Sequence, residues 1–340
     1  MSSNVPFPVE VAAPLWPAGP GARAIRSCRA LLNVAHVWFL SRALGKKFMV
    51  KRIHDYQMCL PIDAKGIKGL PEALVRYGSH EADQVYIVRR ELREGDVVAD
   101  VGANMGYYAL LEAGLVGRSG HVYAIEPATD NLALLQDNIK RNGKADTIET
   151  FHLGISDRVE SGRLYLSALR NCHAFLETRP HPRPEVAGAP EVEMVPMADL
   201  STFAADKRPI NLVRMDVEGY EVKVLRGMRP YIEHARHEMK ILFEVHRSRY
   251  DDGEFDMRRE LTHLFNCGFA AKTIVAKPLI DGKPWGRTAF TDRGYIPDFV
   301  MSAEGAERAF FTGVSPADVI DYVCSVGCVR ALLLWRPAVT

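Results

Sequence analysis

The segment Val97–Tyr108, VVADVGANMGYY, constrains the fold more than any other part of the chain. A short apolar run passes there directly into a glycine turn and then into a helical pattern. Gly102 allows the backbone to turn tightly and to approach a ligand without a Cβ clash. Gly106 allows the following helix to pack close to the strand. A strand, a glycine turn and a helix in this order are typical of nucleotide-binding α/β sheets.

Short apolar runs alternate with amphipathic helical patterns along the rest of the chain. We expect strands at 96–101, 121–125, 147–153, 163–167, 192–195, 210–215, 240–245 and 269–275, and helices at 81–92, 107–114, 131–142, 221–228 and 257–267. Repeated strand–helix–strand units predict an α/β fold of the Rossmann-like, doubly wound kind, with a mainly parallel sheet. Ligands bind such sheets at the carboxyl ends of the strands.

The pattern outside this alternation divides the chain into three parts. Residues 23–48 have helical periodicity and residues 49–80 read as short strands and turns, which predicts a helical and β-stranded N-terminal extension over 1–80. We expect this extension to serve as a cap, an oligomer contact or a substrate contact. The core is predicted to cover 81–300, and 301–340 to form a C-terminal extension that is mainly helical.

Composition is ordinary for a globular chain, with 47% hydrophobic and 25% charged residues. The six cysteines lack the spacing of a zinc site, so we expect reduced thiols. No secretory signal and no stretch of transmembrane length stands out, which predicts a cytoplasmic protein without stable membrane insertion.

Positive charge gathers in residues 1–80, which hold 11 Lys and Arg against 4 Asp and Glu. This region has no interleaved aromatics, so we expect no nucleic-acid partner. The apolar helical stretch at 30–44 favours packing onto the core. It also suits a homo-oligomer contact or, through Trp38 and Phe39, a membrane interface.

Three strand ends carry residues suited to an adenosyl ligand. Asn104 stands where the dinucleotide fingerprint has its middle glycine, which indicates a ligand without a pyrophosphate, such as one with a sulfonium. Asp100 ends the first core strand and can bind an ammonium group. Glu126 lies at the spacing typical of ribose recognition. Asp157 follows the third core strand and can accept from the adenine amine.

Acidic residues also follow the fourth and fifth core strands. Asp216 and Glu218 come after one strand, and Glu244 and His246 come after the next, on one face by alternation. These four residues are our candidates for the general base of a proton transfer. Asp216, Glu218 and Glu244 suit a hard cation such as Mg²⁺, but carboxylates are so common that we expect no metal. Asn171 and His173 are further candidates to contact an acceptor.

Together these residues resemble the FkbM-type methyltransferase family. The motifs that carry the resemblance are DVGANMGYY (Asp100–Tyr108), IEP (Ile125–Pro127), ISD (Ile155–Asp157) and MDVEGYE (Met215–Glu221), within roughly residues 75–275. Arg214 stands where the family often has lysine. The resemblance implies a class I methyltransferase fold with S-adenosylmethionine as methyl donor. It places the methionine end against Asp100, Gly102, Asn104 and Gly106, the ribose against Glu126 and the adenine near Asp157.

The resemblance further implies methylation of a hydroxyl oxygen on a glycan or a small natural product. Two alternatives are a catalytically silent S-adenosylmethionine-binding module and a methyltransferase that acts on nitrogen or a carboxylate. The carboxylates after the fourth strand favour an enzyme over a silent module. A nicotinamide-dependent oxidoreductase is disfavoured, because the middle glycine of the fingerprint is missing.

Overall fold

The computed structural model describes residues 20–62, 67, 69–166, 173–175, 191–277, 285–304 and 306–339. The α-helices are α1 (Pro20–Trp38), α2 (Leu70–Tyr77), α3 (Ala82–Glu91), α4 (Tyr107–Leu115), α5 (Thr129–Arg141), α6 (Leu200–Ala204), α7 (Glu221–Gly227), α8 (Arg229–His234), α9 (Met257–Asn266), α10 (Trp285–Thr291) and α11 (Pro316–Asp321). Short π or 3-10 segments are Phe39–Ala43, Arg247–Arg249 and Tyr322–Val326. The strands are β1 (Phe48–Ile53), β2 (Tyr56–Pro61), β3 (Val97–Val101), β4 (His121–Ile125), β5 (Ile148–Phe151), β6 (Gly154–Ser156), β7 (Glu160–Leu166), β8 (His173–Phe175), β9 (Glu191–Asp199), β10 (Leu212–Met215), β11 (Met239–Glu244), β12 (Ala270–Ala276), β13 (Phe299–Ala303), β14 (Ala306–Phe311) and β15 (Val329–Arg336).

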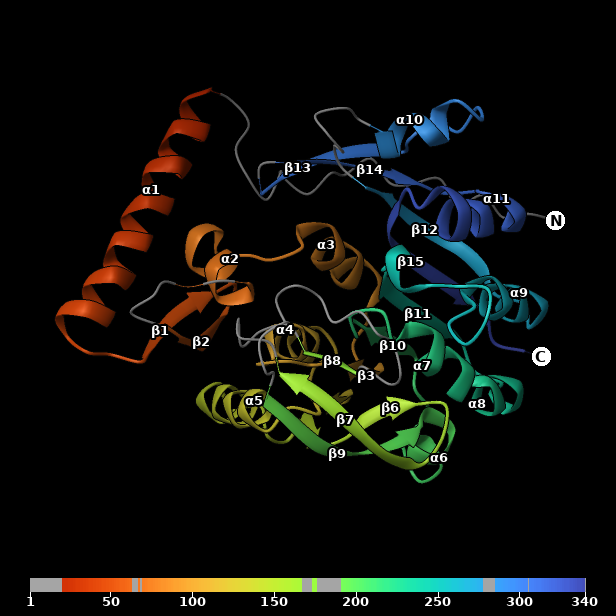
Figure 1. Cartoon of the computed structure of the whole chain (residues 1–340), viewed down its shortest axis with the longest axis horizontal. Helices are drawn as coiled ribbons and strands as arrows, with labels where there is room; N and C mark the ends of the chain where they lie inside the picture. Colours follow the sequence, from red (N-terminus) through yellow and green to blue (C-terminus); the bar gives the residue numbers. More distant parts are fainter. Residues whose placement is uncertain are drawn as a thin grey trace.

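A nine-stranded sheet forms the centre of the molecule, in the order β13-β14-β12-β15-β11-β10-β3-β4-β5 (Figure 1). The five strands from β11 to β5 are parallel. The chain leaves β3 toward β4 and β5 on one side and later adds β10 and β11 on the other. The predicted α/β, doubly wound and mainly parallel architecture of a class I methyltransferase is therefore confirmed. The strand order reverses between β3 and β10, where such sheets bind ligands.

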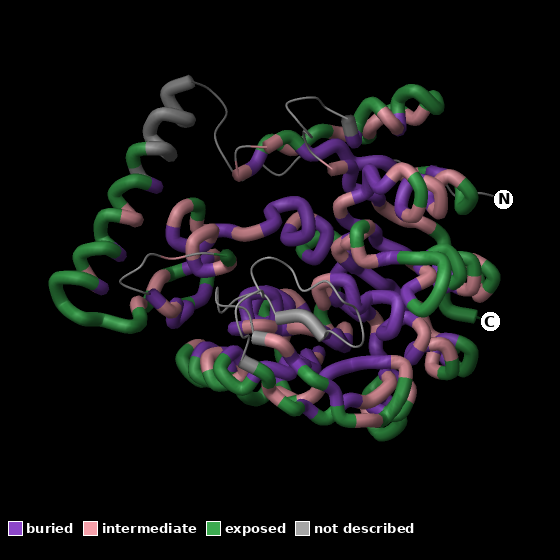
Figure 2. Tube along the Cα trace, in the orientation of Figure 1, coloured by how far each residue is buried: buried purple, intermediate pink, exposed green. Residues whose placement is uncertain are grey.

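Both faces of this sheet are covered. Every residue of β3 is buried, as expected for a parallel strand between two helical layers. Val97, Ala99 and Val101 face one apolar cluster with helices α6 to α9, and Val98 faces the other with α2 to α5. Figure 2 shows this buried centre in purple, inside a largely exposed rim.

A smaller sheet, in the order β6-β9-β7-β8, begins directly after β5 along the chain. Its β6 and β7 contribute the buried side chains Ile155 and Leu164, which line the cavity of the candidate active site. Asp199 ends β9 and caps helix α6 by accepting a hydrogen bond from the Thr202 amide.

The N-terminal part contains a helix and a β-hairpin, as predicted, and also the helix α2, which the turn-rich sequence did not indicate. Helix α1 stands at the edge of the molecule (Figure 1). The large exposed apolar side chains on and just after it are Leu31, Leu32, Trp38, Phe39 and Leu44. An oligomer contact through this helix stays a prediction. No helix in the described ranges is long and apolar enough to cross a bilayer.

The expectation of a mainly helical segment over 301–340 is wrong, because β14 and β15 lie there as well as α11. Strand β15 pairs antiparallel with both β11 and β12, so it lies inside the central sheet. Its sequence, VRALLLWR, is a short apolar run that periodicity alone does not separate from a buried helix. Burial on both faces of the sheet explains why the run does not alternate.

Candidate active site

Strand register brings the predicted residues together at the switch in strand order. Val101 of β3 is level with Met215 of β10, which is level with Phe243 of β11. The residues that follow these three positions therefore lie side by side. A cavity of about 530 Å³ opens at this point, within the range of small-molecule sites. Of the predicted residues, its lining includes Gly102, Asn104, Glu126, Asp216, Glu218, Glu244 and His246.

The glycine turn is shaped by contacts inside the protein. Gly102 has φ +81°, and a Cβ there would lie 2.4 Å from the carbonyl oxygen of Asp216. A Cβ on Gly106, at φ +91°, would lie 2.6 Å from Cδ1 of Leu135. Gly106 thus permits close packing against α5, whereas the sequence suggested packing against the strand. Both positions require glycine for the backbone angle and for space.

Glu126 closes one end of the cavity. Its Oε2 accepts a hydrogen bond from the Asn104 amide at 2.8 Å, and its Oε1 accepts one from the Ala128 amide at 2.9 Å. Burial raises the pKa of Glu126 to about 7, although these amide hydrogen bonds lower it. The carboxyl group is therefore held in place, with its charge sensitive to pH near neutrality.

Three predicted cofactor residues do not line the cavity, namely Gly106, which packs against α5, and the two carboxylates Asp100 and Asp157. Asp100 is fully buried and pairs with Arg214, whose Nη1 lies 3.0 Å from Oδ1. Asp157 faces Lys223 at 3.3 Å and Arg226 at 3.2 Å, which tie its carboxylate to helix α7. Asp100 lies near the end of β3 and Asp157 directly after β6, but both side chains are committed to ion pairs. Their direct contacts with a cofactor stay predictions.

The side of the cavity next to Glu126 suits an adenosine. Leu153, Ile155 and Leu164 give the cavity an apolar side beside Glu126. An apolar slot for a planar base next to a carboxylate for ribose hydroxyls is the arrangement that an adenosyl group requires. The residues present therefore fit S-adenosylmethionine.

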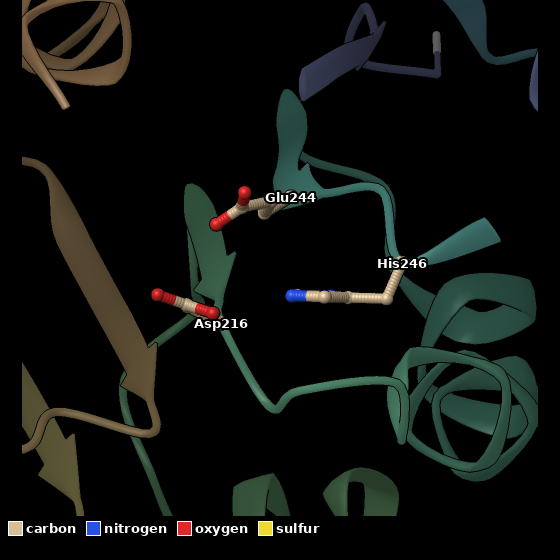
Figure 3. Close-up of side chains that lie close together, drawn as sticks. All are labelled: Asp216, Glu244 and His246. Atoms are coloured by element: carbon tan, nitrogen blue, oxygen red, sulfur yellow. The ribbon is translucent and has the colours of Figure 1, made fainter. Parts of the chain in front are cut away.

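The opposite end of the cavity is an acidic cluster around one imidazole (Figure 3). Asp216, Glu244 and His246 each have a potential ligand atom within 4.8 Å of the others. Nε2 of His246 also lies 3.5 Å from Oε2 of Glu218. The four predicted catalytic candidates are thus brought together, although their roles stay predictions. Asn171 lies outside the described residues, as does the side chain of His173.

His246 is oriented by Glu221, a fully buried residue at the start of α7. Nδ1 of His246 lies 2.8 Å from Oε1 of Glu221, and the Tyr250 hydroxyl donates to Oε2 at 3.2 Å. Burial alone would lower the pKa of His246, but the Glu221 carboxylate outweighs it and the pKa rises to about 10. The ring is therefore held with its Nε2 edge toward the cavity.

The two carboxyl groups of the cluster retain protons more readily than usual. Burial and the charge of Glu81 raise the pKa of Asp216 to about 7. Burial also holds the pKa of Glu244 well above its ordinary range, with Glu81 adding to the effect. Such shifts are common where acid–base chemistry takes place.

Two residues of this site, Glu81 and Arg330, were not predicted from the sequence. Arg330, on β15, contacts Glu81 at 2.9 Å, Asp83 at 3.0 Å and Glu244 at 3.1 Å. The residues it joins are distant in sequence, so no local motif reveals the group. The only signal was an arginine within the apolar run of β15, which implies a buried partner.

Known proteins with similar sequences identify the family of this chain. The sequence model of the methyltransferase FkbM domain matches residues 100–270, half of the chain. The chain belongs to the FkbM methyltransferase family. Its cofactor is S-adenosylmethionine, as the sequence predicts. The match begins at Asp100 and ends in β12, so it includes the glycine turn and the acidic cluster.

Two curated relatives cover parts of this FkbM-family chain. Hexuronic acid methyltransferase AglP of Haloferax volcanii is 26% identical over 170 residues, which cover 49% of this chain and 62% of that protein. Ribosomal protein L11 methyltransferase of Desulforamulus reducens is 36% identical over 121 residues, 35% of this chain and 38% of that protein. The chain therefore spans less than two thirds of either relative.

The chain is also similar to solved structures, at identities that bear on the fold alone. Methyltransferase FkbM from Methylobacillus flagellatus KT is 13% identical, with a TM-score of 0.34, and the match covers 71% of this chain and 53% of that one. TYW2 of M. jannaschii, in complex with AdoMet, is 13% identical with a TM-score of 0.39, covering 86% of this chain and 87% of that one.

Proposed function

We propose that this FkbM-family chain transfers a methyl group from S-adenosylmethionine to a hydroxyl oxygen of a glycan or a small natural product. One observation carries the proposal. A single cavity has Glu126 and an apolar slot at one end, and Asp216, Glu244 and His246 at the other. A site for the methyl donor thus adjoins groups able to handle the proton of an acceptor hydroxyl.

The cofactor end requires little rearrangement of the protein. Glu126 is already held by two backbone amides, and its carboxylate would accept from the ribose hydroxyls. Leu153, Ile155 and Leu164 would enclose the adenine. When bound, S-adenosylmethionine supplies a methyl group that its sulfonium has already activated. Positioning by the protein then provides much of the rate acceleration.

Asp216 is the best placed proton acceptor at neutral pH. Its pKa of about 7 matches the working pH, which is the condition for efficient general-base catalysis. His246, with a pKa of about 10, carries a proton at neutral pH and would donate a hydrogen bond to the acceptor oxygen. Glu221 would keep the ring in that orientation.

A glycan acceptor is favoured by the relative from Haloferax volcanii, a hexuronic acid methyltransferase by name. The cavity is also lined by His80, a basic side chain that would suit an acceptor with a carboxylate, whereas Arg330 is already paired with Glu81 and Glu244. Gly69 and Leu70 also line the cavity, so residues before the matched family domain contribute to it.

The test is a methyl-transfer assay with labelled S-adenosylmethionine and pools of glycans, uronic acids and natural products. We expect label on an oxygen atom, detected by mass spectrometry as the gain of one methylene unit. Asp216→Asn should lower kcat by about a hundredfold, as for loss of a general base. Asp206→Asn, which changes an exposed aspartate, should not.

Other outcomes would assign another function. Cofactor binding without transfer to any pool would indicate a silent binding module. Label on nitrogen or on a carboxylate would replace the hydroxyl acceptor.

A further inference from the structure

Asp216, Glu244 and His246 have the composition and spacing of a cation site. Asp216 follows β10, Glu244 ends β11 and His246 lies two residues beyond it, so three ligands come from the ends of adjacent strands. One atom from each side chain lies within 4.8 Å of the others. Two carboxylate oxygens and one imidazole nitrogen are ligands that Mn²⁺ and related divalent cations accept. Figure 3 shows a ring nitrogen of His246 directed toward the two carboxyl groups.

The support around His246 is typical of a metal-binding histidine. Its Nδ1 is held at 2.8 Å by Glu221, so Nε2 is the nitrogen that faces the cluster. Metal-ligating histidines regularly donate their other ring N–H to a carboxylate, which fixes both tautomer and orientation. Glu221 is itself fixed by the hydroxyl of Tyr250 and by the Gly219 amide.

Asp216 keeps an oxygen atom available, whereas Glu244 shares its carboxyl group with Arg330 and Glu81. Oδ1 of Asp216 is buried and has no hydrogen-bond partner among the described residues. Asp216 lies 3.7 Å from Arg214 through its other oxygen, Oδ2. Oε1 of Glu244 is held by Arg330 at 3.1 Å, which orients the group. A buried, unpartnered oxygen is costly unless a ligand or a proton satisfies it.

We propose that Asp216, Glu244 and His246 bind one divalent cation whose remaining positions face the cavity and take the oxygen of the acceptor hydroxyl. This proposal rests on the proposed function, because it assigns the cation to the acceptor end of the same cavity. A cation there would take the place of the proton that His246 otherwise carries on Nε2, and it would lower the pKa of a bound hydroxyl and orient it. An acceptor with two neighbouring oxygen atoms, such as a sugar diol or a hydroxy acid, would be preferred because it chelates.

Mn²⁺ binding tests the proposal without any cofactor or acceptor. The purified full chain is stripped with EDTA and titrated with Mn²⁺, and free Mn²⁺ is measured by its electron paramagnetic resonance signal. We expect one site per chain, with pulsed spectra that show the ¹⁴N coupling of a histidine ligand. Absence of a site, or of ¹⁴N coupling in the wild-type protein, would overturn the proposal and would indicate that a proton occupies the cluster.

Substitutions test whether the cation binds at this cluster and not at other acidic residues. Asp216→Asn and His246→Gln should each weaken Mn²⁺ binding at least about tenfold, and Glu221→Gln about tenfold through loss of ring orientation. Glu149→Gln, a change in an exposed glutamate on β5, is the matched control and should leave the affinity unchanged. Unchanged affinity in Asp216→Asn and His246→Gln would place the cation elsewhere and refute the site.

S-adenosylmethionine binding, measured by calorimetry in EDTA, distinguishes the two proposals. Binding of S-adenosylmethionine without a Mn²⁺ site would remove the cation and leave the proposed function standing. A Mn²⁺ site in a chain that does not bind S-adenosylmethionine would overturn the proposed function, and with it the role of the cation in positioning an acceptor.

Discussion

The role of a single residue in this protein depends on the groups that its side chain contacts. The sequence predicts cofactor contacts for Asp100 near the end of β3, for Glu126 directly after β4 and for Asp157 directly after β6 of the smaller sheet. Only Glu126 lines the cavity, because its neighbours are backbone amides that leave the carboxyl group in place at the wall. Asp100 and Asp157 have arginine or lysine partners within 3.3 Å and are turned toward them.

The raised pKa of Glu126 predicts that the affinity for S-adenosylmethionine depends on pH. Its pKa is raised to about 7 in the free protein, and ribose hydroxyls require the ionised form as acceptor. Below pH 7 a proton must first be lost, so affinity falls as pH falls, and above pH 7 it levels off. S-adenosylmethionine should bind about tenfold more weakly at pH 6 than at pH 8, by calorimetry.

Glu126→Gln is the control for this effect, because glutamine does not titrate. The variant should bind more weakly than the wild type, and its affinity should change less between pH 6 and pH 8. Any change of affinity with pH that remains in the variant would come from other titrating groups, such as Asp216. An identical change of affinity with pH in both proteins would show that Glu126 is not the group that causes the pH dependence.

At the scale of elements, β15 has the greatest effect on the structure of the sheet. It comes after β13 and β14 along the chain, yet it lies between β11 and β12 and contributes Arg330 to the lining of the cavity. Strand β12 therefore joins the parallel strands through β15. Because β11 holds Glu244, the packing of β15 also positions the acidic cluster.

Leu333→Ala tests how strongly β15 supports the sheet. The side chain is fully buried and packs in the cluster that covers one face. Its removal should lower the free energy of unfolding by about 2–5 kcal/mol, as for other buried leucines. Leu31→Ala, at a side chain 66% exposed, should change it by less than about 0.5 kcal/mol. Urea denaturation measures both, and equal effects would contradict the assigned burial.

At the scale of the whole molecule, a buried ion-pair network joins the N-terminal part to the end of the chain. Arg330 links Glu81 and Asp83, at the start of α3, to Glu244 on β11. Arg308 on β14 adds a second cation at 3.1 Å from Asp83. The start of helix α3, which precedes the matched family domain, is thus attached to the sheet through charges as well as through apolar contacts.

Arg330→Ala should destabilise the whole chain. It leaves Asp83 and Glu81, which are buried, with fewer positive partners, and such losses cost about 3–5 kcal/mol. Arg76→Ala, which removes a half-exposed pair with Glu72, should cost less than about 1 kcal/mol. Denaturant midpoints of the two variants measure the difference, and similar midpoints would show that the network contributes little.

The sequence determined the order of the core elements, the turn at Gly102, the family and the groups at the strand ends. These depend on local patterns, since apolar periodicity and glycine geometry act over a few residues. Only the tertiary structure decided which side chains face the cavity, how Glu221 orients His246, and that Arg330 reaches Glu244. These features depend on contacts between segments far apart in the chain, and a single sequence does not encode them in any local pattern.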